Sequence, residues 1–177
     1  MTVLMAFLAT MLAVNPPRRA LELDPRPRPD AAALGAAAVL AVVVVVAWVS
    51  DPLLSALDVS DPNWRIAAGL VLAARGLVDL VLAPKPFPEG WSGRGEALIP
   101  VAFPVLLRPE VAAIGLAAGT DQGVVVAGAA AAVALAAAVA ATTWWTKQAP
   151  ARAVAGVISA AAAAVGITLM VQGVLDL

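Results

Sequence analysis

The chain consists mostly of long apolar stretches separated by short polar segments. Six of the apolar stretches are long enough, at about 20 residues, to cross a bilayer as α-helices. The stretches cover approximately residues 2–23, 31–50, 64–83, 97–119, 123–145 and 153–175. The pattern therefore predicts an all-α polytopic membrane protein with six transmembrane helices.

The first and fourth stretches are each interrupted near their midpoints. The first interruption reads Asn15-Pro16-Pro17-Arg18-Arg19, and the second reads Leu107-Arg108-Pro109-Glu110. Proline removes a backbone donor and clashes with the preceding turn, so a helix bends or ends there. Inside a bilayer, freed backbone groups and charges must be satisfied by protein or by trapped water. Helices broken at corresponding positions in two halves of a chain indicate a transporter-like binding site near the midplane.

The charges between the stretches predict the orientation of the chain. Eight cations fall in loops on one side, namely Arg18, Arg19, Arg26, Arg28, Lys85, Arg94, Lys147 and Arg152. The opposite loops hold Asp51, Asp58, Asp61 and Asp121, with Arg65 as their single cation. Because Lys and Arg accumulate in cytoplasmic loops, both termini are predicted to lie outside the cytoplasm.

Three spans in each half would give the two halves opposite orientations in the membrane. We therefore predict one membrane domain over residues 1–177, built as an inverted 3+3 repeat. Residues 1–84 form the first repeat, 85–94 a cytoplasmic linker and 95–177 the second repeat. The halves share no close sequence identity, so the repeat is inferred from the pattern of spans and interruptions.

The composition agrees with a membrane protein and excludes several kinds of chemistry. The chain is 62% hydrophobic and 13% charged, with a mean hydropathy of +0.94. Cys, His and Tyr are absent, which removes disulfides, thiol chemistry, imidazole bases and the usual zinc or haem ligands. We expect no cofactor, no metal and no nucleic-acid partner. A composition rich in Ala, Val and Arg suggests a high-GC bacterium, and hence its cytoplasmic (inner) membrane.

Four stretches resemble a known family. They read FLATMLAVNP (7–16), LLSALDVSDPNWRIAAGLVLAARGLVDL (53–80), ALIPVAFPVLLRPEVAAIG (97–115) and ITLMVQGVLDL (167–177). In their order and spacing they resemble the first, third, fourth and last helices of the MarC family, six-span bacterial membrane proteins grouped with LysE-type exporters. The resemblance implies a six-helix fold and a role in the membrane, and it leaves the cargo open.

The chain departs from the family pattern at both interruptions. The family has glycine soon after its Asn-Pro, where this chain has Pro17-Arg18-Arg19, and it has Gly-Pro-Gly where this chain has Arg108-Pro109-Glu110. The chain thus resembles a divergent member. Arginine in place of glycine favours an anionic or phosphate-bearing cargo, because a guanidinium binds phosphate bidentately and does not deprotonate.

The prolines and Asn15 are candidate cargo-binding residues. Carbonyls freed by the breaks, together with the Asn15 amide, can bind a ligand; this set comprises Asn15, Pro16, Pro17, Pro104 and Pro109. One alternative is a packing kink satisfied by neighbouring helices. Another is that the first span ends at Pro16, which would make Arg18 and Arg19 ordinary cytoplasmic anchors.

Four charged residues inside the predicted spans complete the candidate site. Arg75 and Asp79 are four residues apart, so they either neutralise each other or point into a central cavity, as an anion site and a protonatable carboxylate. Arg108 and Glu110 either take part in cargo and proton binding or form an internal salt bridge. We predict that Arg108 faces away from lipid and has an anionic partner, either cargo or one of Asp79 and Glu110.

These residues support three hypotheses about function. The first is a small secondary transporter or flippase for a small or lipid-linked, anionic cargo. The second is a non-transporting accessory or scaffold subunit of a larger membrane complex. The third, an intramembrane enzyme, is least favoured because only Asp79 and Glu110 could act as a carboxylate pair. Lipids are expected partners, and the Ala- and Gly-rich faces at 128–141 and 160–166 would pack inside the bundle or against a second copy.

Overall fold

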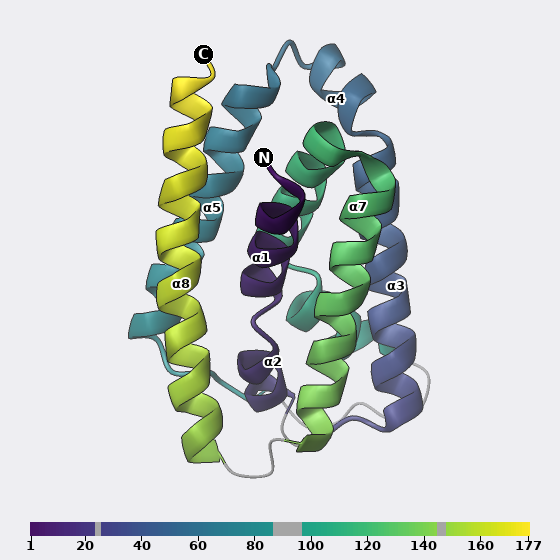
Figure 1. Cartoon of the computed structure of the whole chain (residues 1–177). Helices are drawn as coiled ribbons and strands as arrows, with labels where there is room; N and C mark the ends of the chain where they lie inside the picture. The colour runs from purple at the N-terminus through teal and green to yellow at the C-terminus, as the bar shows by residue number, and fades with distance from the viewer. Residues whose placement is uncertain (24–25, 87–96, 145–147) are drawn as a thin grey trace.

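The computed structural model describes residues 1–23, 26–86, 97–144 and 148–177, which are helical and contain no strand (Figure 1). The helices are α1 (Val3–Val14), α2 (Pro16–Glu22), α3 (Pro29–Trp48), α4 (Ser50–Ala56), α5 (Asp61–Val81), η1 (Ala97–Leu106), α7 (Pro109–Trp144) and α8 (Gln148–Leu175). The expected all-α class is therefore confirmed. Most of the predicted linker at 85–94, with Arg94, and also Lys147 lie outside the described residues.

Three of the described helices are long and apolar enough to cross a bilayer. They are α3, α8 and the stretch Pro109–Thr142 of α7. The first predicted span is divided between α1 and α2, and α5 carries four charged residues along its 21 residues. The long apolar helices indicate a membrane protein.

Helix α7 is not one straight rod, because it reverses direction at Gly123. Gly123 has a φ of +81°, a conformation open to glycine and strained for other residues. A methyl group added to Gly115 would lie 2.9 Å from a methyl carbon of Val43, and one added to Gly128 would lie 3.2 Å from a methyl carbon of Val44. Residues on both sides of the turn therefore pack against the same part of α3 (Figure 1).

Both interruptions found in the sequence are present in the structure. Helix α1 ends at Val14, Asn15 adopts a left-handed conformation with φ +47°, and α2 begins at Pro16. Proline is suited to the first position of a helix because its missing N–H would have no partner there. The second interruption separates η1 from α7, which begins at Pro109; η1 itself is irregular, with extended backbone at Ile99 and Phe103.

Small residues fill the interior, whereas many large apolar side chains point outward. Alanines dominate the buried positions, while Leu4, Trp48, Val81, Val125 and Trp144 are more than 70% exposed. An apolar surface of this extent is unusual for a soluble monomer and is typical of helices that face lipid. The outward-facing apolar residues thus agree with the membrane assignment.

Glycines bring α5 and α8 into close contact along their lengths. A methyl group added to Gly69 would lie 2.5 Å from the Gly166 carbonyl oxygen, and one on Gly76 would lie 2.6 Å from the Ser159 carbonyl oxygen. Small residues allow helix backbones to approach in this way in membranes. The 160–166 stretch therefore packs inside the chain, and a homo-oligomer built through the small-residue faces stays a prediction.

Candidate functional site

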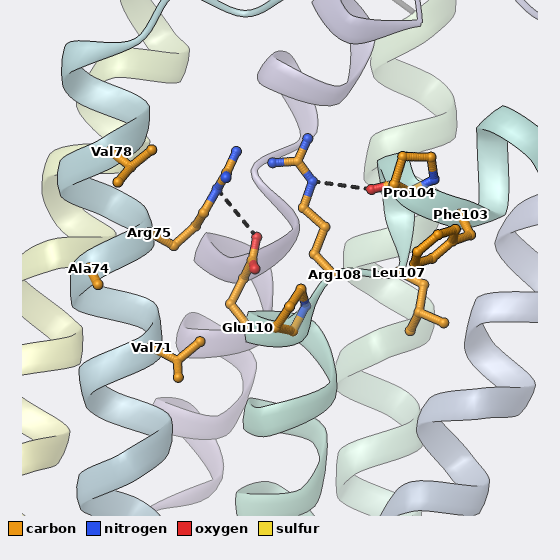
Figure 2. Close-up of a pocket in the computed structure, with 10 residues that line it drawn as sticks. Val71, Ala74, Arg75, Val78, Phe103, Pro104, Leu107, Arg108 and Glu110 are labelled. Atoms are coloured by element: carbon orange, nitrogen blue, oxygen red, sulfur yellow. Dashed lines mark hydrogen bonds and ion pairs between the residues drawn. The ribbon is translucent and has the colours of Figure 1, made fainter.

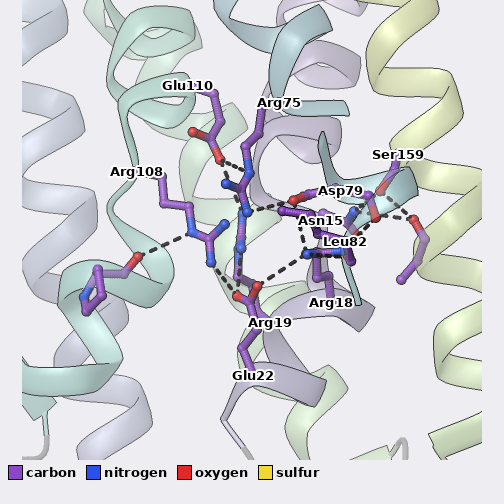
Figure 3. Close-up of polar contacts among 12 residues, drawn as sticks. Asn15, Arg18, Arg19, Glu22, Arg75, Asp79, Leu82, Arg108, Glu110 and Ser159 are labelled. Carbon is purple, nitrogen blue, oxygen red and sulfur yellow. Dashed lines mark hydrogen bonds and ion pairs between the residues drawn. The ribbon is translucent and has the colours of Figure 1, made fainter. Parts of the chain in front are cut away.

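Seven charged residues gather between α2, α5 and the start of α7 (Figure 3). This arginine cluster consists of Arg18, Arg19, Glu22, Arg75, Asp79, Arg108 and Glu110. Three short segments supply all of it, because two helix breaks and the end of α5 meet there. The cluster is held by ion pairs that connect residues far apart in the sequence.

Arg19 lies at the centre of the cluster, and its side chain is completely buried. Its Nη1 lies 2.8 Å from Glu22 Oε2, and its Nη2 lies 3.4 Å from Glu110 Oε1. Nη2 also donates to the Ala13 carbonyl oxygen at 3.3 Å. That carbonyl belongs to the last turn of α1, where helical carbonyls have no partner within the helix. Arg19 therefore provides a hydrogen-bond donor to a carbonyl near the break at Asn15 and a positive charge to two carboxylates.

Arg18 caps the end of α5. Its Nη1 donates to the Asp79 carbonyl oxygen at 2.8 Å, and its Nη2 donates to the Leu82 carbonyl oxygen at 3.1 Å. Its Nε lies 3.2 Å from both Glu22 Oε1 and Asp79 Oδ1. A cation is favoured at a helix C-terminus, because the last carbonyls carry partial negative charge and lack helical partners. Arg18 thus has a structural role at the end of α5, and the two neighbouring carboxylates balance its charge.

Arg75 and Arg108 differ from these two arginines because they open onto a hollow (Figure 2). The Arg75 side chain is 30% exposed and that of Arg108 is 15% exposed. Arg75 Nη2 lies 2.6 Å from Asp79 Oδ1, and Arg75 Nε lies 3.7 Å from Glu110 Oε1. Arg108 Nη2 lies 2.6 Å from Glu22 Oε2. Both arginines therefore remain accessible although each has a carboxylate partner.

The hollow has a volume of about 650 Å³ and lies between α5 and the segment that joins η1 to α7. Its polar lining comes from Arg75, Arg108 and Glu110, and the rest is apolar. A smaller hollow of about 260 Å³ adjoins it and is lined in part by Arg18, Glu22 and Lys85. The two hollows share Arg75, Val78, Pro104 and Arg108.

The arginine cluster carries an excess of positive charge. Four guanidinium groups face three carboxylates, which leaves a net charge of +1. The buried Nε of Arg75 has no hydrogen-bond partner among the described residues. Arg75 and Arg108 present guanidinium groups to a hollow from a cluster whose charge is not fully compensated among the described residues, an arrangement suited to bind an anion.

The structure brings most of the predicted site residues together. Arg75, Pro104, Arg108, Pro109 and Glu110 line the larger hollow. Pro104 also accepts a hydrogen bond at its carbonyl oxygen from Arg108 Nε, at 3.3 Å. Asp79 is buried behind Arg75, with which it forms the ion pair that the four-residue spacing predicts.

Asn15 lies beside the cluster in a closely packed space. Its Nδ2 donates to Ser159 Oγ at 3.0 Å and to the Ala155 carbonyl oxygen at 3.4 Å. Its Oδ1 is buried and has no hydrogen-bond partner among the described residues. A space of about 10 Å³ lies next to it, between Asn15, Asp79 and Ser159. That volume is close to the minimum for one water molecule, so the structure offers no room for cargo there.

Pro16 and Pro17 do not line the larger hollow. They border a separate apolar hollow of about 340 Å³ together with Met11, Trp144 and Ile158. Both prolines occupy the first turn of α2, so they start the helix that presents Arg18 and Arg19. Their position indicates that they shape the helix break and do not take part in lining the larger hollow.

Two expectations about the arginines need correction. Arg18 and Arg19 are buried, so they are not exposed cytoplasmic anchors. Removing them from the eight cations leaves six against one, and the orientation stays a prediction. The expected anionic partner of Arg108 is present, but the carboxylate paired with it is Glu22, instead of Asp79 or Glu110.

Glu22 is the residue that the sequence reasoning missed. A signal for it was available, because Glu22 follows Arg18 by four residues and Arg19 by three, spacings at which helical side chains meet. Ser159 carried no such signal. It is an isolated hydroxyl in an alanine-rich helix, and its contact with Asn15 depends on how α8 packs.

A second ionic group lies at the other end of the bundle. Arg65 donates to both carboxylate oxygens of Asp121, at 3.1 and 2.6 Å, and it also pairs with Asp176. This group connects α5, the turn of α7 and the end of α8. The Asp176 side chain remains 54% exposed although it takes part in this ion pair.

Among the described residues, no group of three or more Asp, Glu, His or Cys side chains is placed to hold a metal ion. Comparison of the chain with protein-family models, with curated proteins and with solved structures found no match. The function of the arginine cluster therefore has to be argued from its own chemistry.

Proposed function

We propose that this chain is a small bacterial membrane transporter or flippase that carries an anionic cargo through the hollow beside the arginine cluster. One observation carries the proposal: Arg75 and Arg108 open onto a hollow of about 650 Å³ from a cluster with a net charge of +1. Buried charge in a membrane protein usually marks a pathway or a binding site. A purely structural network would be expected to balance its charges.

The proposal includes six membrane spans. At 1.5 Å per residue, α1 (12 residues) and α2 (7 residues) rise about 18 and 10 Å, which together approach the thickness of the hydrocarbon core. By the same reasoning, η1 and the part of α7 before Gly123 form one broken span, and the rest of α7 forms the next. With α3, α5 and α8 the total is six, in the order expected for two inverted halves like those of the MarC family.

The place of the cluster suggests where the cargo enters. Glu22 is the last residue of α2, and Asp79 is two residues from the end of α5. Both helix ends face the side that the predicted positive-inside orientation assigns to the cytoplasm. The site would then lie between the midplane and the cytoplasmic surface, and the smaller hollow with Lys85 would be its entrance.

Carboxylates of the cluster are candidates for proton coupling. Glu110 lies within ion-pair distance of both Arg19 and Arg75. Protonation of Glu110 would raise the net charge of the cluster from +1 to +2 and remove the weaker of the two ion pairs of Arg75, which would keep Asp79 as its partner. Binding of a proton and of an anion would therefore favour each other, as coupled transport requires.

A transport measurement with phosphate-class anions tests the proposal. Proteoliposomes on a solid-supported membrane would be exposed to pulses of inorganic phosphate, pyrophosphate or decyl phosphate, and the transient current recorded. The wild-type chain should give a current with at least one of these anions. Arg75→Gln should abolish it, because this change neutralises the accessible arginine while Asp79 keeps Arg18 and Glu110 keeps Arg19.

Arg28→Gln is the matched control. Arg28 is 69% exposed and pairs with Asp30 away from the cluster, so its loss should leave the current unchanged. Absence of current with all three anions, in a folded wild-type preparation, would contradict the proposal. Copurification of a stoichiometric membrane partner with such an inactive chain would favour the accessory-subunit hypothesis.

A further inference from the structure

The larger hollow is amphipathic, with charge at one side and an apolar wall at the other. Arg75, Arg108 and Glu110 form the charged side, shown at the centre of Figure 2. The apolar wall is formed from α5 by Val71, Ala74 and Val78, and from the opposite side by Phe103 and Leu107. A small, water-soluble anion would not need such a wall. A cargo with one charged part and one apolar part would place its apolar part against it.

The hollow is open towards the outer surface of the bundle. Helix α5 packs along α8 and η1 packs along α3, and the hollow lies between α5 on one side and η1 with the start of α7 on the other. Phe103 is 61% exposed and Val78 is 41% exposed at this opening. In a bilayer, this opening would face the hydrocarbon chains of the lipids.

We propose that the cargo is a lipid-linked phosphate that enters sideways from the bilayer between α5 and η1. Its phosphate group would lie on Arg75 and Arg108, and the first part of its hydrocarbon chain along Val71, Val78 and Phe103. This inference rests on the proposed function and specifies its cargo. The volume of the hollow lies within the range of about 300–1,000 Å³ typical of ligand sites, ample for a headgroup and the start of a chain.

The smaller hollow gives the phosphate group a continuation towards the end of α5. It is lined by Arg18, Lys85 and the two shared arginines, against a single carboxylate, Glu22. A phosphate could therefore move from Arg75 and Arg108 towards Lys85 without leaving positive charge. The hydrocarbon chain would stay outside, in contact with lipid, as the headgroup moves.

Binding of three probes to the purified chain in maltoside micelles tests this inference. Pyrophosphate reports on the anion site, decyl phosphate on anion and chain together, and decyltrimethylammonium on the chain alone. From thermal stabilisation, decyl phosphate should bind at least about tenfold more tightly than pyrophosphate, since each buried methylene adds favourable free energy. Decyltrimethylammonium should not stabilise the chain.

Two variants separate the chain from the headgroup. Ala74→Phe places a ring in the apolar side of the hollow at an exposed position, and should weaken decyl phosphate about tenfold while leaving pyrophosphate unchanged. Ala160→Phe, at an exposed position of α8 that does not line this hollow, should change neither. Arg75→Gln should weaken both anions.

Each outcome has a distinct meaning. Equal binding of pyrophosphate and decyl phosphate, with no effect of Ala74→Phe, would overturn the lipid-linked cargo and leave a soluble-anion site. Binding of decyltrimethylammonium as tight as that of decyl phosphate would also overturn it, because apolar adsorption would then explain both. Failure of both anions to bind would contradict the anion site itself, and with it the proposed function.

Discussion

Arg108 and Glu22 lie 2.6 Å apart although 86 residues separate them in the sequence. A second pair, Arg19 and Glu110, joins the same two segments at 3.4 Å, but here the arginine comes from α2 and the glutamate from α7. Each helix break thus supplies one arginine and one glutamate to the other. These two contacts hold the break between α1 and α2 against the break between η1 and α7.

Arg19 and Arg75 should differ in what their removal changes. Arg19→Gln should reduce the free energy of unfolding by about 3 kcal/mol, because a fully buried side chain that holds two carboxylates and the Ala13 carbonyl is lost. Arg75→Gln should cost less than about 1 kcal/mol, since its partners keep other arginines and its side chain is partly solvated. Reversible unfolding in mixed SDS–maltoside micelles measures both. A larger loss for Arg75→Gln would show that the hollow-facing arginine is structural.

The helix breaks could be predicted from the sequence because proline and charge act locally. Asn15-Pro16-Pro17 and Pro109 determine where a helix can start or end, whatever packs around them. The ion pair between Arg75 and Asp79 could be predicted equally well, because residues four apart lie on one face of a helix.

Contacts between helices could not be read from the sequence in the same way. Arg108 was expected to pair with Asp79 or Glu110, yet it reaches Glu22, because the depth and rotation of α2 decide which carboxylate faces it. The burial of Arg18 and Arg19 depends likewise on α2 continuing into the bundle, and the open side between α5 and η1 depends on how each packs with other helices.

Gly76 should be intolerant of even a methyl group. A Cβ at this position would lie 2.6 Å from backbone atoms of α8, so Gly76→Ala should push α5 and α8 apart and reduce the free energy of unfolding by about 1–3 kcal/mol. Gly156→Ala is the control, since nothing lies within 4 Å of its added carbon. That control should be neutral or stabilising by up to about 1 kcal/mol. Equal effects of the two changes would contradict the close α5–α8 contact.

Asn15 should respond to backbone conformation as well as to hydrogen bonding. Asn15→Gly and Asn15→Ala both lose the bond to Ser159, but only alanine is strained at a φ of +47°. We expect the free energy of unfolding of Asn15→Ala to be about 1 kcal/mol lower than that of Asn15→Gly. The same unfolding titration measures the difference. If the alanine variant is the more stable one, the left-handed break does not form at Asn15.

The proposed orientation can be tested directly, because the chain contains no cysteine. Helix α4 and the C-terminus lie at one end of the bundle (Figure 1). Single cysteines at Ser55 in α4 and at the C-terminal Leu177 should therefore react with a membrane-impermeant maleimide in intact spheroplasts. The beginnings of α3 and α8 lie at the opposite end, so cysteines at Arg28, which precedes α3, and at Ala149 in the first turn of α8 should react only after lysis. The reverse pattern would invert the assigned orientation, and labelling of Ser55 without Leu177 would contradict six crossings.

The ion pairs of α2 also constrain the order in which the chain can be assembled during synthesis. Arg18 and Arg19 leave the ribosome early, whereas Asp79 and Glu110 follow 61 and 91 residues later. Until then the hydrocarbon core offers these arginines no interhelical counterion, so α2 is expected to wait at the aqueous surface. Helix α2 would then settle late, entering the bundle only once α5 and the start of α7 are in place.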